Sequence, residues 1–336
     1  MPLFQNKSLK EYNTFNIDVK SLYSFFASSE QDILNFIDSA VYKEHPSFVL
    51  GGGSNVLFTR DFNGSVILIQ NKGIQVVRER NNDVLVKIEA GENWDQLVEF
   101  CVNRGYGGIE NLSLIPGTVG ASPIPNIGAY GVELKDVFYE AEFIEKGTKK
   151  KRTIKKEECN FGYRESIFKN ELANRAIVIN VTLKLSKTQQ LKLDYGSIKD
   201  ELKAIQNPGI KDVREAVIKI RREKLPDPKQ LPNAGSFFKN PVISSDKYEH
   251  IALNHKNLIS YKTDDGKVKL AAGQLIDLCG WKGIREEHAG VHDKQALVLV
   301  NHNNATGQDI IELASRIEAS VFLKFGINIE KEVTVI

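Results

Sequence analysis

Short apolar runs and helix-like spacing of apolar residues alternate along the first hundred residues. The runs at 66–69 and 84–88 have the length and composition of short strands. Apolar residues recur three and four positions apart over 33–41 and over 94–102, which predicts an amphipathic helix at each place. Ser28 is expected to cap the first helix, with Gln31 at the capping-box position. The opening therefore predicts the order strand, helix, strand, loop, strand.

The second half of the chain is more polar and more helical. Residues 211–224 carry an apolar face at helical spacing, and Leu225-Pro226-Asp227-Pro228 is expected to end that helix. We place a domain change near this point. Thr306 is expected to cap the last long helix, which precedes Gly326, and residues 329–335 predict a closing edge strand.

Composition narrows the class of protein. The 336 residues suggest two or three domains, and 41% apolar with 26% charged residues is ordinary for a soluble protein. A net charge of +2 makes no case for nucleic-acid binding. Three widely spaced cysteines, Cys101, Cys159 and Cys279, suggest no disulfide framework. The first residues lack an apolar signal region, so we expect a cytoplasmic globular protein without a membrane partner.

Residues 48–58 place three glycines, Ser54 and Asn55 between two apolar tripeptides. Glycine accepts positive φ and lets backbone N–H groups approach an anion closely. We interpret this segment as a loop between two strands that cradles a diphosphate. A simple hairpin turn stays open as the alternative.

A Rossmann dinucleotide site is disfavoured at this loop. The G-x-G-x-x-G fingerprint needs a third glycine, a following helix and an acidic residue about 20 positions on. Position 56 is Val56, the segment after the loop is strand-like, and Gly73 stands where the acid would be.

A second glycine-rich segment runs from Ile115 to Gly131. It holds four glycines and three prolines in 17 residues, which rules out a regular element through most of it. Loops of this length in a compact domain are usually functional or disordered, and the apolar content argues against disorder. We interpret the 115–131 loop as a second wall of the same site.

Other catalytic patterns are weak or missing in the sequence. His288 and His292 are four apart, but Gly290 lies between them and no general-base Glu does, so we expect no metal site. No Gly-x-Ser-x-Gly elbow and no P-loop sequence occurs. The basic run 149–152 is expected to be a solvated hairpin.

Two further segments could carry chemistry. Asn233–Pro241 places small residues before Ser236, which would let a ligand approach its hydroxyl, although a loop entering an aromatic strand is the plainer alternative. Tyr163-Arg164 could be a surface turn, yet an arginine suits a bidentate grip on a carboxylate.

These segments occur together in one order, with Lys224–Pro228 between the last two. In that combination the chain resembles the UDP-N-acetylenolpyruvoylglucosamine reductase family, flavoenzymes that complete UDP-N-acetylmuramic acid for bacterial peptidoglycan. The resemblance covers nearly the whole chain, from residue 12 to residue 332, and the serine segment is its most specific piece. The glycine loop alone would be shared with other flavoproteins.

The resemblance implies an α+β fold with a two-part FAD-binding region of the vanillyl-alcohol oxidase/p-cresol methylhydroxylase type and a smaller α+β substrate domain. The expected boundaries are 1–70 and 71–225 for the two FAD-binding subdomains, 226–331 for the substrate domain, and 332–336 for a strand with the catalytic Glu. It implies non-covalent FAD, NADPH as hydride donor, a UDP-sugar enolpyruvyl ether as substrate, and a monomer.

The resemblance also implies residue roles. The implied catalytic residues are Arg164, Ser236 and Glu332, and the implied substrate contacts are Tyr163, Tyr195, Lys224 and Asn240. Tyr195 matches the tyrosine of the longer type of this reductase, which folds over the UDP-sugar. The implied FAD contacts come from the two glycine-rich segments: Gly51, Gly52, Gly53, Ser54, Asn55, Ile115, Pro116, Gly117, Gly120, Ala121, Asn126, Gly128, Ala129 and Gly131.

The implied chemistry is physically coherent. The substrate is an enol ether conjugated to a carboxylate, so hydride from reduced flavin N5 can add at the terminal carbon and charge develops on the carboxylate. Arg164 and a protonated Glu332 would stabilise that charge where it forms. Ser236 would donate a proton to the adjacent carbon as general acid.

Two points depart from the family or stay open. The family often has an Arg two residues after the catalytic Glu, where this chain has Thr334. Glu330 would share a strand face with Glu332, and only the motif match favours Glu332. An FAD-dependent alcohol or lactone oxidase of the same fold, and a non-catalytic nucleotide-sugar binder, remain as alternative functions.

Overall fold

The computed structural model describes residues 3–188, 190–195, 197–263 and 265–336. The chain divides into two compact units. The first unit comprises the residues up to Lys7, Ser21–Gly53 and Phe62–Glu223, and the second comprises Ser8–Lys20, Ser54–Asp61 and Lys224–Ile336. Two short early segments thus belong to the C-terminal unit, and the expected four-part division stays a prediction.

A four-stranded sheet opens the first unit in the order β1-β2-β5-β3. Its strands are β1 (Leu3–Ser8), β2 (Lys20–Ala27), β5 (Phe62–Ile69) and β3 (Ser47–Leu50), and β5 pairs in parallel with both β2 and β3. The helices α1 (Glu30–Asp38) and α2 (Ala40–Glu44) connect β2 to β3. Phe25 and Phe36 stack at 4.3 Å between ring centroids, so the apolar face expected over 33–41 does pack onto the sheet.

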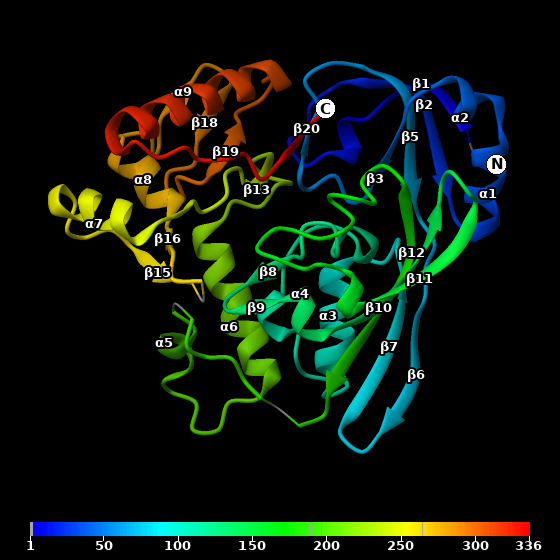
Figure 1. Ribbon diagram of the computed structural model, residues 1–336, viewed down its shortest axis with the longest axis horizontal. Helices are drawn as coiled ribbons and strands as arrows, with labels where there is room; N and C mark the ends of the chain where they lie inside the picture. Colours follow the sequence, from blue (N-terminus) through cyan, green and yellow to red (C-terminus); the bar gives the residue numbers. More distant parts are fainter. Residues whose placement is uncertain (1–2, 189, 196, 264) are drawn as a thin grey trace. The chain divides into compact units, whose positions relative to one another are not determined.

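A second, antiparallel sheet of the first unit has the order β11-β10-β12-β7-β6 (Figure 1). Its strands are β6 (Ile74–Arg80), β7 (Asp83–Glu89), β10 (Phe138–Glu145), β11 (Lys150–Lys155) and β12 (Ala176–Ser186). The helix α3 (Trp94–Asn103) shares its apolar face with this sheet in one buried apolar cluster. The predicted amphipathic helix at 94–102 is therefore confirmed.

The glycine-rich 115–131 loop contains only short elements: η3 (Val119–Ala121) and the start of a two-residue hairpin, β8 (Gly128–Ala129) with β9 (Val132–Glu133). Further short elements of the unit are η2 (Glu110–Leu112), α4 (Leu134–Val137), η4 (Lys156–Glu158) and α5 (Ile198–Leu202). The helix α6 (Ile210–Lys224) matches the predicted 211–224 helix and packs its buried face on α5.

The second unit is also mixed. One antiparallel sheet has the order β13-β19-β18-β17 and another β14-β16-β15, while the last strand, β20, pairs in parallel with β4. The helix α9 packs on β18 and β19 (Figure 1). The bounds are β4 (Val56–Leu57), η1 (Lys10–Tyr12), β13 (Asn233–Ser236), β14 (Val242–Ile243), α7 (Ser245–Asn254), β15 (Ser260–Lys262), β16 (Val268–Leu270), α8 (Ala272–Leu278), β17 (Arg285–Glu286), β18 (Ala289–Val291), β19 (Val298–Asn301), α9 (Gly307–Phe325) and β20 (Thr334–Val335).

Both units mix helices and strands, which confirms the α+β class. Two local predictions were wrong. The first helix is capped by Ser29, whose hydroxyl accepts the N–H of Asp32, rather than by Ser28. The closing strand is only Thr334–Val335, because the backbone of residues 331–332 bonds to residues 237–238 before the chain reaches β4.

Thr306 caps α9 as expected, and Gly326 ends it in the left-handed conformation. No helix in the described ranges is long and apolar enough to cross a bilayer.

Candidate active site

The two glycine-rich segments lie directly against each other within the first unit. A Cβ on Gly52 would lie 2.7 Å from the Cα of Gly117, and one on Gly51 would lie 2.9 Å from Ala121 Cβ. Neither distance can accommodate a side chain. Gly53 has φ of +63°, which further favours glycine. Close contact between the two segments therefore accounts for Gly51 and Gly52, and the diphosphate cradle stays a prediction.

The part of the 115–131 loop that contacts Gly51 and Gly52 is held by backbone hydrogen bonds to the segment that follows β7. Val119 donates to the carbonyl of Glu92, Gly120 donates to that of Ala90, each at 2.9 Å, and Trp94 donates to Gly117 at 3.1 Å. A Cβ on Gly120 would lie 2.5 Å from that of Ala90. The η3 turn is thus held rigidly beside the glycine loop, as a site for a large ligand needs.

Arg164 is held at the far end of the 115–131 loop. Its Nη2 donates to the carbonyl of Gly128 at 3.2 Å, and its backbone has φ of +56°. Asn126, fully buried, donates to the carbonyl of Gly162 at 2.9 Å and fixes the turn that carries Tyr163 and Arg164. A strained φ at a non-glycine residue costs free energy and is common at functional sites. The structure thus brings Arg164 to the loop expected to line the flavin.

Tyr195 approaches the same loop. Its ring lies edge-on to that of Tyr130, with 6.0 Å between centroids, and the backbone of Gly131, with φ of +80°, lies beside it. Tyr195 remains 44% exposed, so its ring is accessible to a ligand. A predicted substrate contact and a predicted FAD contact are therefore neighbours.

Arg221 of α6 is a half-buried cation with a buried Nε that sequence reasoning missed. Burial lowers the pKa of its guanidinium, while Tyr130 and Asp95 oppose that shift, and its Nε has no hydrogen-bond partner among the described residues. A half-buried, incompletely bonded guanidinium beside the 115–131 loop suits an anionic or carbonyl-rich ligand. The only signal in the sequence was an arginine next to the apolar helix face that ends at Ile220.

The start of the 115–131 loop is fixed by an ion pair that was also missed. Asp95 accepts two hydrogen bonds from Arg214, at 2.6 and 3.2 Å, and one from the N–H of Leu114 at 2.6 Å. Burial raises the pKa of Asp95, but the bonds from Arg214 and Leu114 outweigh it, so the pKa lies below its usual value. Asp95 thus links α3, α6 and the loop.

In the second unit, Asn55 and the segment that follows Ser236 both bond to the backbone of Glu332. The N–H of Glu332 donates to the carbonyl of Phe237 at 2.8 Å, and the side chain of Asn55 donates to the carbonyl of Glu332 at 3.3 Å. Thr334 in turn donates to the carbonyl of Asn55 at 3.0 Å. Asn55 and Glu332 therefore lie beside the segment that carries Ser236.

Ser236 ends β13 opposite Val298, after a turn at Gly235 with φ of +67°. Asn233 accepts the N–H of Gly235 at 2.8 Å and so shapes this turn. The next residue, Phe237, is fully buried against Phe15 and Phe238. The half-buried hydroxyl of Ser236 is thus supported by a rigid aromatic core.

Glu330 behaves differently from Glu332. Its side chain is 74% exposed and pairs with Lys239 at 3.0 Å. Lys331 forms an antiparallel bridge with Phe238, and the bonds on either side of it join residues 330 and 332 to residues 239 and 237. Glu332 is half-buried, unlike Glu330, and its role at the site stays a prediction.

Lys224 and Asn240 are the two other predicted substrate contacts in the second unit. Lys224 is exposed at the last position of α6. Asn240 uses its side-chain oxygen to accept the N–H of Ala272 at 2.9 Å, which caps the start of α8. Ser54 lies between Gly53 and Asn55 and is half-buried.

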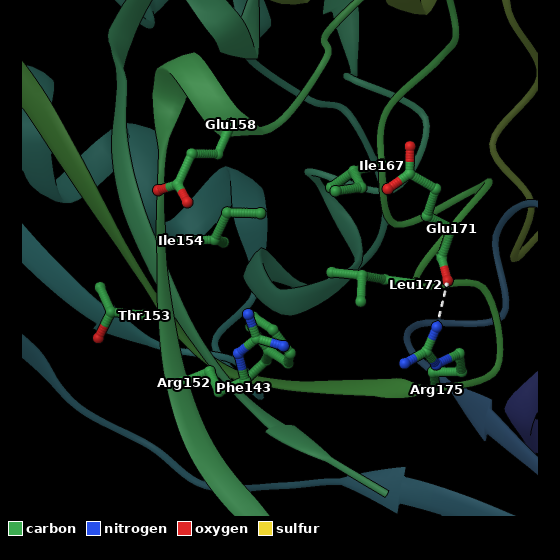
Figure 2. Close-up of a pocket in the computed structure, with 9 residues that line it drawn as sticks. All are labelled: Phe143, Arg152, Thr153, Ile154, Glu158, Ile167, Glu171, Leu172 and Arg175. Atoms are coloured by element: carbon green, nitrogen blue, oxygen red, sulfur yellow. Dashed lines mark hydrogen bonds between the residues drawn. The ribbon is translucent and has the colours of Figure 1, made fainter. Parts of the chain in front are cut away.

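A surface pocket of about 230 Å³ in the first unit contains none of the predicted site residues (Figure 2). Arg152 and Arg175 both approach the carboxylate of Glu145, at 3.6 and 3.0 Å, so each arginine already has an acidic partner. The residues that line this pocket are Phe143, Arg152, Thr153, Ile154, Glu158, Ile167, Glu171, Leu172 and Arg175. In the described ranges no cluster of three or more His, Cys, Asp or Glu side chains could hold a metal ion.

Known proteins similar to this chain identify its class. Residues 22–149 match the model of an FAD binding domain, and residues 227–336 match that of the C-terminal domain of UDP-N-acetylenolpyruvoylglucosamine reductase. The chain is 46% identical over 334 residues to the UDP-N-acetylenolpyruvoylglucosamine reductase of Pseudomonas aeruginosa, covering 99% of this chain and 98% of that protein. It is 44% identical to the reductase of Flavobacterium johnsoniae over the full length of both chains.

The solved structure of the reductase from Thermus caldophilus has the same fold, with a TM-score of 0.69 over 99% of this chain and 98% of that chain at 22% identity.

The two family models and the curated relatives define an FAD-dependent oxidoreductase with a separate C-terminal domain. The chain belongs to the UDP-N-acetylenolpyruvoylglucosamine reductase family. The predicted family, enzyme class, FAD cofactor and two-part flavoprotein fold are confirmed, and the oxidase and the non-catalytic binder are disfavoured. The individual site residues stay predictions.

Proposed function

We propose that this protein reduces UDP-N-acetylglucosamine enolpyruvate to UDP-N-acetylmuramate, with NADPH as reductant, in the synthesis of peptidoglycan precursors. The observation that carries the proposal is the placement of Glu332 against Phe237, directly after Ser236. The position of Arg164 on the carbonyl of Gly128, in the loop that faces the glycine cradle, supports it further.

The residues of the first unit fit FAD. Gly51, Gly52 and Gly120 lie where side chains would clash with neighbouring backbone or Cβ atoms, and Arg221 adds a half-buried cation with an unpaired Nε. Such a surface suits a diphosphate and a flat polar ring. Ser54, Asn55 and the 115–131 loop would supply the remaining contacts. When bound, FAD would accept hydride from NADPH and pass it to the terminal enolpyruvyl carbon.

Arg164 and Glu332 would recognise the substrate carboxylate. A guanidinium matches a carboxylate in a fork geometry, and a protonated Glu332 would add one hydrogen-bond donor. Charge builds on the carboxylate oxygens as hydride arrives, so both contacts strengthen in the transition state. The hydrogen bond to Gly128 and the bonds to Phe237 and Asn55 support pre-organised positions for the two residues.

Ser236 would donate the proton that completes the reduction. A hydroxyl is a weak acid, but the carbon that receives the proton is strongly basic at that stage, so a serine suffices. Ser236 follows a left-handed glycine and precedes a buried phenylalanine, which supports a fixed position for its Oγ. Tyr163, Tyr195, Lys224 and Asn240 would bind the UDP-sugar.

We also propose that the protein is cytoplasmic, where NADPH and UDP-sugars are available. The proposal further includes a monomer and a substrate domain that begins near residue 226. Size-exclusion chromatography with light scattering tests the oligomeric state.

One anaerobic experiment tests the function. One equivalent of NADPH should bleach the flavin absorbance, and later addition of UDP-N-acetylglucosamine enolpyruvate should restore it with formation of UDP-N-acetylmuramate. Acid-quenched protein should release free FAD. Reoxidation by oxygen but not by the enolpyruvyl sugar would point to an oxidase, and colourless protein would point to a binder without flavin.

A further inference from the structure

Asn111 joins two distant segments through one amide group. Its Nδ2 donates to the carbonyl of Tyr130 at 2.9 Å and to the carbonyl of Lys192 at 2.8 Å. Tyr130 belongs to the 115–131 loop, and Lys192 lies three residues before Tyr195. Because both partners are carbonyl oxygens, only the NH₂ group can face them, which fixes the orientation of the amide.

The base that carries Asn111 is rigid. Asn111 lies in η2 and is 1% exposed. The indole of Trp94 donates to the carbonyl of Leu112 at 3.0 Å, and the carboxylate of Glu110 accepts the N–H of Gly108 at 2.6 Å. A side chain on such a base can position the more exposed segments that it bonds.

The segment that Asn111 bonds, residues 190–195, is also held by side-chain contacts, and Asp194 in it pairs with Lys199. Leu191 and Leu193 pack on the α6 face beside Tyr130, and Tyr195 ends the segment with its ring against that of Tyr130. No helix or strand includes these residues. The two bonds from Asn111 therefore connect the backbone of the segment to the backbone of the loop.

Asn111 is not optimal for stability alone. Its Oδ1 is buried and has no hydrogen-bond partner in the described parts of the chain. An unpaired buried oxygen costs free energy, which an apolar side chain of similar size would avoid. The residue therefore serves the two carbonyls, at a cost to the fold.

We propose that Asn111 is a positioning residue for the substrate, which holds residues 190–195 against the 115–131 loop so that Tyr195 is ready to contact the UDP-sugar. This inference rests on the substrate-binding role proposed for Tyr195. A pre-organised segment lowers the entropic cost of binding. Loss of the two bonds leaves only a fraction of the molecules with the segment in place, and the apparent affinity for the substrate falls in proportion to that fraction.

The test replaces Asn111 by Ala and by Leu, the latter to keep volume and remove the unpaired oxygen. KM for the enolpyruvyl UDP-sugar should rise about 10- to 100-fold, as two hydrogen bonds of ordinary strength would give, while kcat changes less than about threefold. FAD retention and flavin reduction by NADPH should stay near normal. Asn180→Ala is the matched control, since Asn180 is also a buried amide with an unpaired Oδ1, on β12.

A double-mutant cycle with Tyr195→Ala decides the mechanism. Asn111→Ala should add less than about a twofold effect on KM in the Tyr195→Ala background, because both changes remove the same contact. Additive effects, a KM change equal to that of Asn180→Ala, or loss of folding in both Asn111 variants would overturn the inference. Unchanged KM in Tyr195→Ala itself would instead remove the proposed role of Tyr195, and the inference with it.

Discussion

The backbone N–H of Glu332 donates to the carbonyl oxygen of Phe237, at 2.8 Å. The bond joins the last residues of the chain to the serine segment almost a hundred positions earlier. It makes the position of Glu332 independent of its own side chain, so substitutions there can change chemistry without moving the backbone. Glu330, two residues earlier, gives a matched comparison within the same segment.

Glu332→Ala should therefore lower the rate of the substrate half-reaction by about 10²-fold or more, because the hydrogen-bond donor to the developing charge is lost. Glu330→Ala should change the rate less than about twofold, since the exposed side chain of Glu330 pairs with Lys239 at the surface. Stopped-flow reoxidation of the reduced flavin measures both. Equal effects of the two substitutions would contradict the assignment.

Ser236→Ala should leave flavin reduction by NADPH intact and slow the second half-reaction by about 10²- to 10⁴-fold, the usual contribution of a general acid. Ser245→Ala is the control, because Ser245 only bonds the carbonyl of Gly266 at an exposed position. Equal slowing of both half-reactions by Ser236→Ala would remove the proton-donor role.

Arg164→Lys should also reduce turnover of the enolpyruvyl sugar, since an ammonium group cannot form the bidentate hydrogen bonds that a guanidinium makes to a carboxylate. We expect KM for the enolpyruvyl sugar to rise and kcat to fall, with FAD retained. Arg175→Lys, which alters an exposed arginine paired with Glu145, serves as the comparison. Near-normal steady-state turnover of Arg164→Lys would count against the carboxylate clamp.

Gly52→Ala should weaken FAD retention, because the new Cβ would lie 2.7 Å from the Cα of Gly117 and force the two glycine-rich segments apart. Gly147→Ala is the control, since nothing lies within 4 Å of a Cβ at that turn. The ratio of flavin to protein absorbance after gel filtration measures retention. A yellow, fully loaded Gly52→Ala protein would place the cradle elsewhere.

Part of the candidate site could be predicted from the sequence. The glycine loop, the 115–131 loop and the serine segment could be identified because their residue types are required by local backbone geometry, as at Gly52 and Gly235. Asn111 could not, because its partner Lys192 lies 81 residues away and no local pattern marks the contact. Arg221 resembled any other helix arginine until its burial was known.

Strand alternation could not decide between Glu330 and Glu332, because residues two apart share a face and both neighbours of Lys331 bond to the segment 237–239. The motif match favours Glu332, and its role stays a prediction.

The ion pair of Asp95 with Arg214 predicts how stability depends on pH. Because the pKa of Asp95 is lower in the folded state, its stabilisation is fully present above its unfolded pKa, near 4, and is lost as pH falls through the folded value. Asp95→Asn should lower the free energy of unfolding by about 1.5–3 kcal/mol at pH 7, as loss of charge-assisted hydrogen bonds does.

The difference between wild type and Asp95→Asn should then shrink as the pH falls below about 4, because the wild-type carboxylate becomes protonated there. Urea unfolding at pH 7, 5, 4 and 3 measures it. Asp83→Asn is the control, since Asp83 pairs with Lys184 at an exposed position and should contribute less than about 1 kcal/mol. A difference that stays constant with pH would mean that Asp95 acts through packing rather than charge.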